Sequence, residues 1–129
     1  MTFLGLLAVG GGAAAGAWLR WWLGLLLNPV FPTLPFGTLA ANLIGGYLMG
    51  LVLGVLSQFE ALAPEMRLLI TTGFLGGLTT FSTFSLEVVT LIGRQEYWWA
   101  LGAASLHLFA SLMLTAAGIL LANALFVRA

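Results

Sequence analysis

The sequence has no cysteine and no aspartate, and its 129 residues include only four arginines, four glutamates and one histidine. Without cysteine, the chain cannot form a disulfide, a thiolate metal site or a thiol nucleophile. Without aspartate it has no Ser-His-Asp triad, and no group of its residues has the spacing of a side-chain metal site. The net charge is zero and no basic cluster occurs, which argues against nucleic acid as a partner. We therefore expect neither an enzyme nor a nucleic-acid-binding protein.

Charged residues make up only 6% of the chain, whereas 61% of the residues are hydrophobic and the mean hydropathy is +1.11. This leaves too little polar surface to cover a water-soluble globule, so the chain is expected to lie in a lipid bilayer. A membrane-spanning helix needs about 20 mostly apolar residues. Four stretches qualify, at residues 3–27, 37–57, 66–92 and 98–126. The sequence predicts an all-α integral membrane protein in which residues 1–129 form a single domain of four transmembrane helices.

The arginines divide equally between the two sides of the membrane if the four spans cross in order. Arg67 and Arg128 then lie on the side of the amino terminus, and Arg20 and Arg94 lie on the other side. Because the arginines and lysines of short loops set the orientation of a membrane protein, we expect insertion in both orientations. The alternative is that the N-terminal amine or the hydrophobicity of the spans selects one orientation.

Glycines recur every fourth residue in the first two spans, at Gly12 and Gly16 and at Gly46, Gly50 and Gly54. Such faces of small residues let helix backbones approach closely. Four helices packed in this way fill their interior with side chains and leave no room for a hydrated pathway. A transport function would therefore need an oligomer, and with insertion in both orientations the simplest choice is an antiparallel dual-topology homodimer.

The third predicted span is too long and has an unusual centre. Its 27 residues would extend about 40 Å as one helix, whereas the apolar core of a bilayer is about 30 Å thick. Gly73, Gly76 and Gly77 lie near its middle, and because glycine is a poor helix former we expect the third helix to be broken between Gly73 and Thr80. Backbone released at membrane depth must be buried in protein or line a cavity. The break therefore predicts a functional site.

Hydroxyl and phenyl groups dominate the segment after this break, which reads TTFSTFS from residue 79 to 85. At 100° per residue, one helix face carries hydroxyls together with Glu87, and the neighbouring face carries two phenyl rings. The hydroxyl face holds Thr79, Thr80 and Thr83, and the phenyl face holds Phe81 and Phe84. The alternatives are that these hydroxyls bond back to carbonyl groups of their own helix and that the rings only pack in a core.

Other polar side chains interrupt the remaining spans. His107, Ser111 and Thr115 recur every four residues and form one stripe on the fourth span, Asn42 lies in the second, and Arg20 is the only charged residue in the first. Polar groups at membrane depth usually face a bundle interior or a watery cavity, and the aligned stripe favours a pathway. Arg20 either extends to the membrane interface or attracts an anion.

These groups share one chemical property. Amide, hydroxyl and imidazole hydrogens, and the edges of phenyl rings, all direct partial positive charge towards an anion. No pair of carboxylates lies at mid-membrane, and Glu87 is near the end of its span, where it can stand at a mouth. The polar residues predict a narrow pathway for a small anion that forms strong hydrogen bonds.

Three blocks of the sequence carry a resemblance to a known family. They read GAWLR at 16–20, GTLAANLIG at 37–45 and GFLGGLTTFSTFSLE at 73–87. In this order and spacing they resemble the Fluc (CrcB) fluoride channels, over the whole chain. The resemblance implies a fluoride-selective channel, built as a dual-topology homodimer with two antiparallel pores. Such a channel passes fluoride passively across the cytoplasmic (inner) membrane of a bacterium and so lowers cytoplasmic fluoride.

The same resemblance implies roles for individual residues. Phe81 and Phe84 would be the pore phenylalanines, Asn42 a pore hydrogen-bond donor, Thr83 and Ser111 hydroxyls on the ion path, and Glu87 a residue near the pore end. A structural sodium ion on the dimer axis would bind backbone carbonyl oxygens of Gly76 and Thr79. Family members vary at the start of the fourth-span stripe, where this chain has Ala103 and His107.

Two other functions compete with the channel. A proton-coupled transporter of the small multidrug-resistance type also has four spans, but it needs an ionisable carboxylate deep in the membrane. The only carboxylate within a span of this chain is Glu87, away from the midplane. An assembly or scaffold protein is the third possibility, and it would have no need for a hydroxyl-rich, broken helix.

Overall fold

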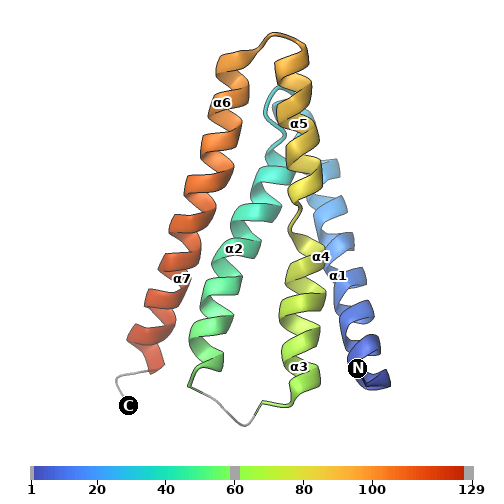
Figure 1. Ribbon diagram of the computed structural model, residues 1–129, viewed down its shortest axis with the longest axis vertical. Helices are drawn as coiled ribbons and strands as arrows, with labels where there is room; N and C mark the ends of the chain where they lie inside the picture. Colours follow the sequence, from blue (N-terminus) through green and yellow to red (C-terminus); the bar gives the residue numbers. More distant parts are fainter. Residues whose placement is uncertain (1, 59–61, 127–129) are drawn as a thin grey trace.

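The computed structural model describes residues 2–58 and 62–126, and every regular element in this part of the chain is helical (Figure 1). The first two spans consist of α1 (Phe3–Leu27), the short 3-10 helix η1 (Asn28–Val30) and α2 (Phe36–Leu56). The third consists of α3 (Pro64–Leu68), the π-helix η2 (Leu69–Leu75), α4 (Gly76–Leu78) and α5 (Phe81–Gly93). The fourth consists of α6 (Tyr97–Ser105), the π-helix η3 (Leu106–Ala110) and α7 (Ser111–Phe126).

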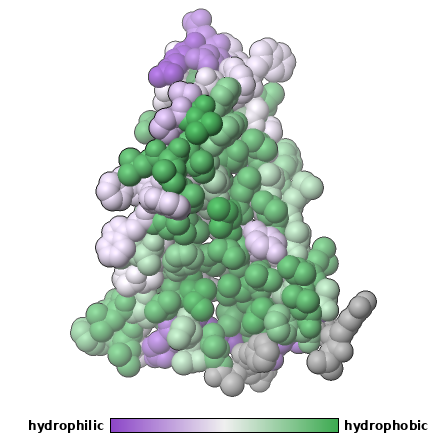
Figure 2. Space-filling model, turned by 180° about the vertical axis from the view of Figure 1, so that it is seen from behind, coloured by the Kyte–Doolittle hydropathy of each residue, from purple (hydrophilic) through white to green (hydrophobic). Residues whose placement is uncertain are grey.

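Among the described residues, four helical segments are long and apolar enough to cross a membrane. They are Phe3–Val30, Phe36–Leu56, Pro64–Gly93 and Tyr97–Phe126. The prediction of an all-α chain with four helices of spanning length is therefore confirmed. Seen from behind in Figure 2, hydrophobic side chains cover most of the molecule, and the strongly hydrophilic ones gather at its two ends. This distribution suits a bilayer around the middle and water at both ends.

The third span changes its packing partner halfway along. Its first half, η2 and α4, packs on α1, whereas α5 packs beside α6 of the fourth span (Figure 1). Between the halves, Thr79 and Thr80 have extended backbone, with φ/ψ of −80°/154° and −147°/122°. The core is next to this point, where Ala41 of α2 meets the fully buried Leu75 and Leu78. The two extended residues thus lie beside the best-packed part of the chain.

The glycines of the third span do not themselves leave the helix. Gly73, Gly76 and Gly77 are helical, and no glycine in the described ranges has a positive φ. Gly73 and Gly77 allow a close approach to α1 instead, because a Cβ atom on Gly77 would overlap the backbone of Ala13 and one on Gly73 would crowd the backbone of Gly12. The interruption at Thr79–Thr80 therefore has a cause other than glycine's backbone freedom.

In the predicted glycine seams on α1 and α2, three glycines lie against the backbone of another helix, namely Gly12, Gly16 and Gly50. A Cβ atom on Gly12 or Gly16 would overlap carbonyl oxygens of η2, and one on Gly50 would overlap the carbonyl oxygen of Thr115 on α7. These atoms belong to the main chain and cannot swing aside, so each glycine holds two helices at a distance that alanine would not permit.

Gly16→Ala is expected to destabilise the fold by about 1–3 kcal/mol, the usual range for overpacking. The added methyl group must move α1 away from the carbonyl of Phe74. Gly11→Ala is the matched control on the same helix, because a Cβ atom there meets nothing within 4 Å. It should be neutral or stabilising, since alanine is the better helix former. Thermal unfolding in detergent micelles compares the two, and equal stability of both variants would contradict the packing argument.

Candidate functional site at the interrupted helix

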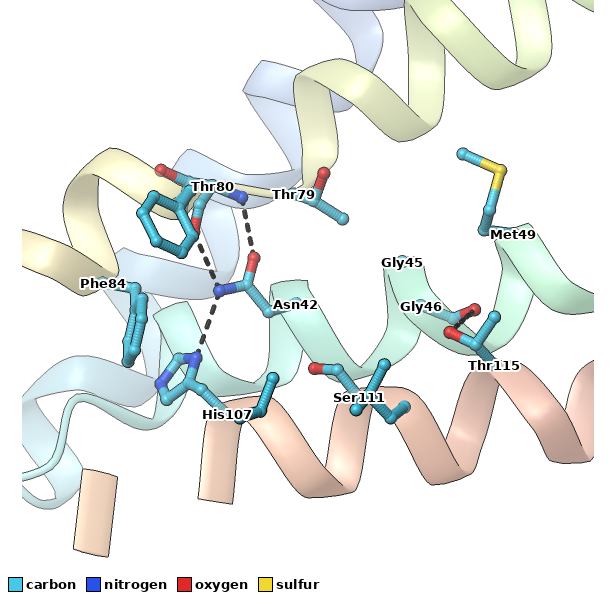
Figure 3. Close-up of a pocket in the computed structure, with 13 residues that line it drawn as sticks. Asn42, Gly45, Gly46, Met49, Thr79, Thr80, Phe84, His107, Ser111 and Thr115 are labelled. Carbon is cyan, nitrogen blue, oxygen red and sulfur yellow. Dashed lines mark hydrogen bonds between the residues drawn. The ribbon is translucent and has the colours of Figure 1, made fainter. Parts of the chain in front are cut away.

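The side chain of Asn42 replaces the helical hydrogen bonds that Thr80 has lost. The amide nitrogen of Thr80 donates to Oδ1 of Asn42 at 2.7 Å, and Nδ2 of Asn42 donates to the carbonyl oxygen of Thr80 at 2.9 Å (Figure 3). Backbone donors and acceptors left unpaired at membrane depth are costly, and one carboxamide from α2 satisfies both of these. Asn42 therefore stabilises the interruption from a position 38 residues away in the sequence.

Thr80 also starts the next helix. Its Oγ1 accepts a hydrogen bond from the amide of Thr83 at 3.2 Å, which makes Thr80 the N-cap of α5. The hydroxyl of Thr80 in turn donates to Oγ1 of Thr83 at 3.1 Å. The amino-terminal end of α5, which carries a positive partial charge, thereby lies in the interior of the third span.

A groove of about 410 Å³ opens between α2, α5 and the fourth span; we call it the phenyl groove. Its lining combines apolar and hydrogen-bonding residues from all three of these elements. It is lined by Asn42, Gly45, Gly46, Met49, Thr79, Thr80, Phe81, Phe84, His107, Leu108, Ser111, Leu112 and Thr115. The rings of Phe81 and Phe84 meet edge to face at 5.6 Å, and the ring of Phe84 lies 4.6 Å from the imidazole of His107, each measured between centroids. Aromatic and polar groups are thus side by side here.

The three members of the fourth-span stripe all line the phenyl groove, but their hydrogen bonds differ. Nδ1 of His107 lies 3.2 Å from Nδ2 of Asn42. The hydroxyl of Thr115 donates to the carbonyl oxygen of Gly46 at 2.9 Å, so it also ties α7 to α2. Ser111 makes no hydrogen bond to another side chain or carbonyl of the described residues, which leaves its hydroxyl available to a ligand.

A second hollow of about 350 Å³ lies on the other side of the interruption; we call it the arginine pocket. Its lining comes mainly from α1, with single residues from η1 and α2 and two from the start of α5. It is lined by Ala17, Arg20, Trp21, Gly24, Leu25, Asn28, Thr38, Thr80 and Thr83. Nε of Arg20 donates to the carbonyl oxygen of Gly77 at 3.1 Å, which holds the guanidinium group at the interruption. Because Thr80 lines both hollows, this extended residue lies between them.

Glu87 lies in neither hollow, although a residue that lines the arginine pocket binds its carboxylate. Thr38 is buried and donates a hydrogen bond from its hydroxyl to Oε1 of Glu87 at 2.5 Å. Neither a role for Thr38 nor this contact between α2 and α5 was predicted from the sequence. The available signal was its position one helical turn before Asn42, on the same face of an otherwise apolar span.

The alternative interpretation, in which the hydroxyls only bond back to nearby carbonyl groups, holds for part of the segment. The hydroxyls of Thr71, Thr79 and Ser85 donate to the carbonyl oxygen of the residue four positions earlier in the third span. Thr80 and Thr83 make no such bond among those observed, and they bond to each other instead. The hydroxyls that remain near the hollows are therefore those at the start of α5.

The carbonyl groups of Gly76 and Thr79 lose their helical donors at the interruption. In a continuous helix the amides of Thr80 and Thr83 would donate to them, but these amides bond to side chains of Asn42 and Thr80. Two carbonyl oxygens near each other in sequence are thereby released, and oxygen donors of this kind suit a hard cation. Within the described ranges, no group of histidine and carboxylate residues could hold a metal ion.

Comparison with known proteins gives matches over nearly the whole chain. Residues 7–119, which include every residue that lines the two hollows, match the family described as "CrcB-like protein, Camphor Resistance (CrcB)". A fluoride-specific ion channel FluC of Pseudomonas putida is 60% identical over 114 residues, which is 88% of this chain and 90% of the relative. The FluC of Nitrosospira multiformis is 57% identical over 120 residues, 93% and 94% of the two chains. That of Cupriavidus necator is 60% identical over 116 residues, 90% and 92% of the two chains.

Proposed function

The chain belongs to the CrcB family, and on this premise we propose that it is a fluoride-selective channel that passes fluoride passively across the cytoplasmic membrane of a bacterium. Relatives about 60% identical over most of its length bear the name of that activity. The observation that best supports the proposal is the lining of the phenyl groove, which brings together two phenyl rings, an imidazole and a free hydroxyl with no carboxylate among them.

Fluoride is small and strongly hydrated, so a pathway for it must replace water with many hydrogen-bond donors. Near the interruption, the hydroxyl of Ser111 and the positive edges of the Phe81 and Phe84 rings supply partial positive charge on one side. The guanidinium of Arg20 and the amino-terminal end of α5 supply it on the other. A fluoride ion passing the interruption would therefore meet positive groups in succession, while apolar walls keep them poorly hydrated.

We propose that the conducting form is an antiparallel homodimer. The phenyl groove is open along one side, and Phe81 is 79% exposed although it is central to the groove lining. An aromatic pathway residue cannot enclose an ion while facing lipid, so the groove needs a second surface. A second copy inserted in the opposite orientation can supply that surface twice, once for each chain's groove, which gives two pores.

A structural sodium ion is the proposed cofactor, bound by the carbonyl oxygens of Gly76 and Thr79 of both chains. The release of both carbonyls from their helical donors supports this assignment. When bound, the ion would neutralise carbonyl dipoles at the dimer axis. Replacing all sodium by a bulky organic cation is expected to weaken the dimer and lower flux, as measured by size-exclusion chromatography and efflux. An unaltered dimer with unaltered flux would argue against the ion.

The proposed activity is tested by efflux from liposomes that contain the purified protein. Internal fluoride should leave the vesicles in response to its own gradient, and internal chloride should stay, each followed with its own electrode. Chloride efflux as fast as fluoride efflux, or no fluoride efflux, would contradict the proposal. Acidification that drives the export of a cationic dye would instead favour the multidrug-type transporter, whose carboxylate would have to be Glu87.

Dual insertion gives a separate prediction. A reporter fused to the carboxyl terminus should be found on both sides of the membrane, because the four arginines give no orienting bias. Two lysines beside Arg128, which lies outside the described residues, should orient the chain one way, and two lysines in the 93–97 turn should orient it the other way. Coexpression of the two variants should restore dimers. More than about 95% of the unmodified reporter on one side would exclude dual insertion.

A further inference from the structure

The side chain of Thr79 is held at both of its branches. Its hydroxyl donates to the carbonyl oxygen of Leu75 at 2.9 Å. Its methyl group lies against the buried Gly45 of α2, because a Cβ atom on Gly45 would overlap Cγ2 of Thr79. The hydroxyl and the methyl group share one torsion angle, so the methyl group cannot turn away without breaking the hydrogen bond to Leu75. Gly45 thus leaves a space for one rotamer of Thr79, and we call this space the glycine notch.

The glycine notch lies one helical turn after Asn42, on the same face of α2. This face therefore contacts the two extended residues in turn, since Asn42 pairs with the backbone of Thr80 and Gly45 receives the methyl group of Thr79 (Figure 3). The amide of Thr79 still donates to the carbonyl oxygen of Leu75 at 3.1 Å, so the helical α4 places its Cβ atom. The notch thus fixes the end of α4 against α2, and Asn42 fixes the first residue beyond it.

A displacement of Thr79 would be passed on to the residues of the candidate pathway. Thr79 lines the phenyl groove, and the next residue, Thr80, lines both hollows and caps α5, which carries Phe81 and Phe84. Of the described helices, only α6 and α2 contact α5. The position of the start of α5 therefore depends on its few contacts with α2, and the residue before them is held in the glycine notch.

We propose that Gly45 is a positioning residue for the anion pathway. By admitting the methyl group of Thr79, it determines where α4 ends against α2 and hence where Thr80 and α5 begin. The inference rests on the proposed channel and adds to it a residue that has no side chain to offer an ion. A methyl group at position 45 should lower fluoride flux by displacing Thr79, and removal of the methyl group of Thr79 should then restore it.

A double-mutant cycle tests this proposal by moving one methyl group across the contact. Gly45→Ala should lower fluoride efflux from liposomes by about tenfold, the factor for an overpacking cost in the lower part of the usual range. Thr79→Ser should have a mild effect, because serine keeps the hydroxyl that bonds to Leu75. The double variant should recover the flux of Thr79→Ser to within about twofold, the usual limit of additivity. A double variant as slow as Gly45→Ala would overturn the proposal, since the new methyl group would then obstruct the groove itself.

Gly54→Ala is the matched control for overpacking on the same helix. Gly54 is also buried on α2, and a Cβ atom there would overlap Cβ of Ala122 on α7. Neither Gly54 nor Ala122 lines a hollow. Both substitutions gain the same helix propensity, so the comparison isolates the contact that each one disturbs. Gly54→Ala should lower the thermal stability of the dimer but retain the flux of folded protein. Equal loss of flux in the two variants would reduce Gly45 to a packing residue and contradict the proposal.

Flux and stability together distinguish failure of this inference from failure of the proposed function. If the wild-type protein passes no fluoride, the channel proposal fails and the role of Gly45 in the pathway fails with it. If the wild-type protein passes fluoride and Gly45→Ala does so equally well, only the inference about Gly45 is wrong. Should Gly45→Ala not form a dimer in size-exclusion chromatography, recovery of the dimer by Thr79→Ser would support the notch, and a double variant that also fails to form a dimer would contradict it.

Discussion

Replacing Phe81 or Phe84 by isoleucine is expected to lower fluoride efflux by about tenfold or more, which corresponds to the loss of roughly one aromatic electrostatic contact. Isoleucine keeps an apolar side chain of comparable bulk but has no ring quadrupole, so it presents no positive edge to a passing anion. Phe81 is 79% exposed in the single chain and touches the ring of Phe84 edge to face. A role limited to packing within the chain is therefore a poor explanation for Phe81.

A packing role and a role in ion contact predict different effects of these substitutions on fluoride flux and on stability. If the rings only packed, a swap between apolar side chains of similar volume would cost less than about 1.5 kcal/mol of stability and would leave flux nearly normal. Phe3→Ile is the matched control, since Phe3 is 73% exposed on α1 and lines neither hollow. Liposome efflux and thermal unfolding are measured for all three variants. Wild-type flux from both groove variants would remove the phenyl rings from the pathway.

The number and extent of the spans could be predicted because a bilayer imposes both. Backbone groups in lipid must bond within their own segment, so apolar stretches of sufficient length become helices. The predicted 37–57 span, for example, is helical at Phe36–Leu56, a difference of one residue at each end. Length and hydropathy are local properties of the chain, so the positions of the spans can be predicted from one sequence.

The place where the third helix is interrupted depends on a residue distant in sequence. The glycines of this span suggested an interruption between Gly73 and Thr80, but all three are helical, and Gly73 and Gly77 serve close contacts with α1. The extended residues are the two threonines at 79 and 80, where the carboxamide of Asn42 is available to pair with the backbone. Helix propensity alone could not indicate which turn of the third span would be extended, because the residue that pairs with the extended backbone belongs to another span.

Residues of the candidate site that follow the helical spacing of one span could be predicted. Contacts that depend on how two spans pack could not. The i, i+4 spacing of His107, Ser111 and Thr115 placed them on one face, and all three line the phenyl groove. The hydrogen bond from Thr38 to Glu87, in contrast, requires a knowledge of how α2 and α5 pack. The direction of the Asn42 carboxamide likewise depends on the amide of Thr80, and no spacing rule contains that information.

Asn42→Asp is expected to abolish fluoride efflux, by about a hundredfold or more, because it acts on the pathway in two ways. A carboxylate in a narrow, poorly hydrated path repels an anion by several kcal/mol at short range. Its oxygen can still accept from the amide of Thr80, so the interruption keeps one of its two hydrogen bonds. The second oxygen, however, has no hydrogen for Nδ1 of His107, and that nitrogen must carry a proton to bond with it.

Aspartate at position 42 should therefore transfer the imidazole proton to Nδ1 and leave a lone pair on Nε2, or produce a doubly protonated imidazolium paired with the carboxylate. If the proton moves to Nδ1, the Nε2–H donor is replaced by a lone pair, which repels an anion as the new carboxylate does. If an imidazolium forms, Nε2–H is retained but lies beside the negative charge of the carboxylate. The ¹⁵N spectrum of His107 distinguishes them, and fluoride flux should be lost in both because the carboxylate remains. Asn42→Ser is the companion variant, since its hydroxyl is uncharged and can donate to only one partner at a time; it should lose less flux than the aspartate variant. Fluoride efflux through Asn42→Asp at the wild-type rate, in a dimer of normal stability, would place the anion pathway away from the phenyl groove.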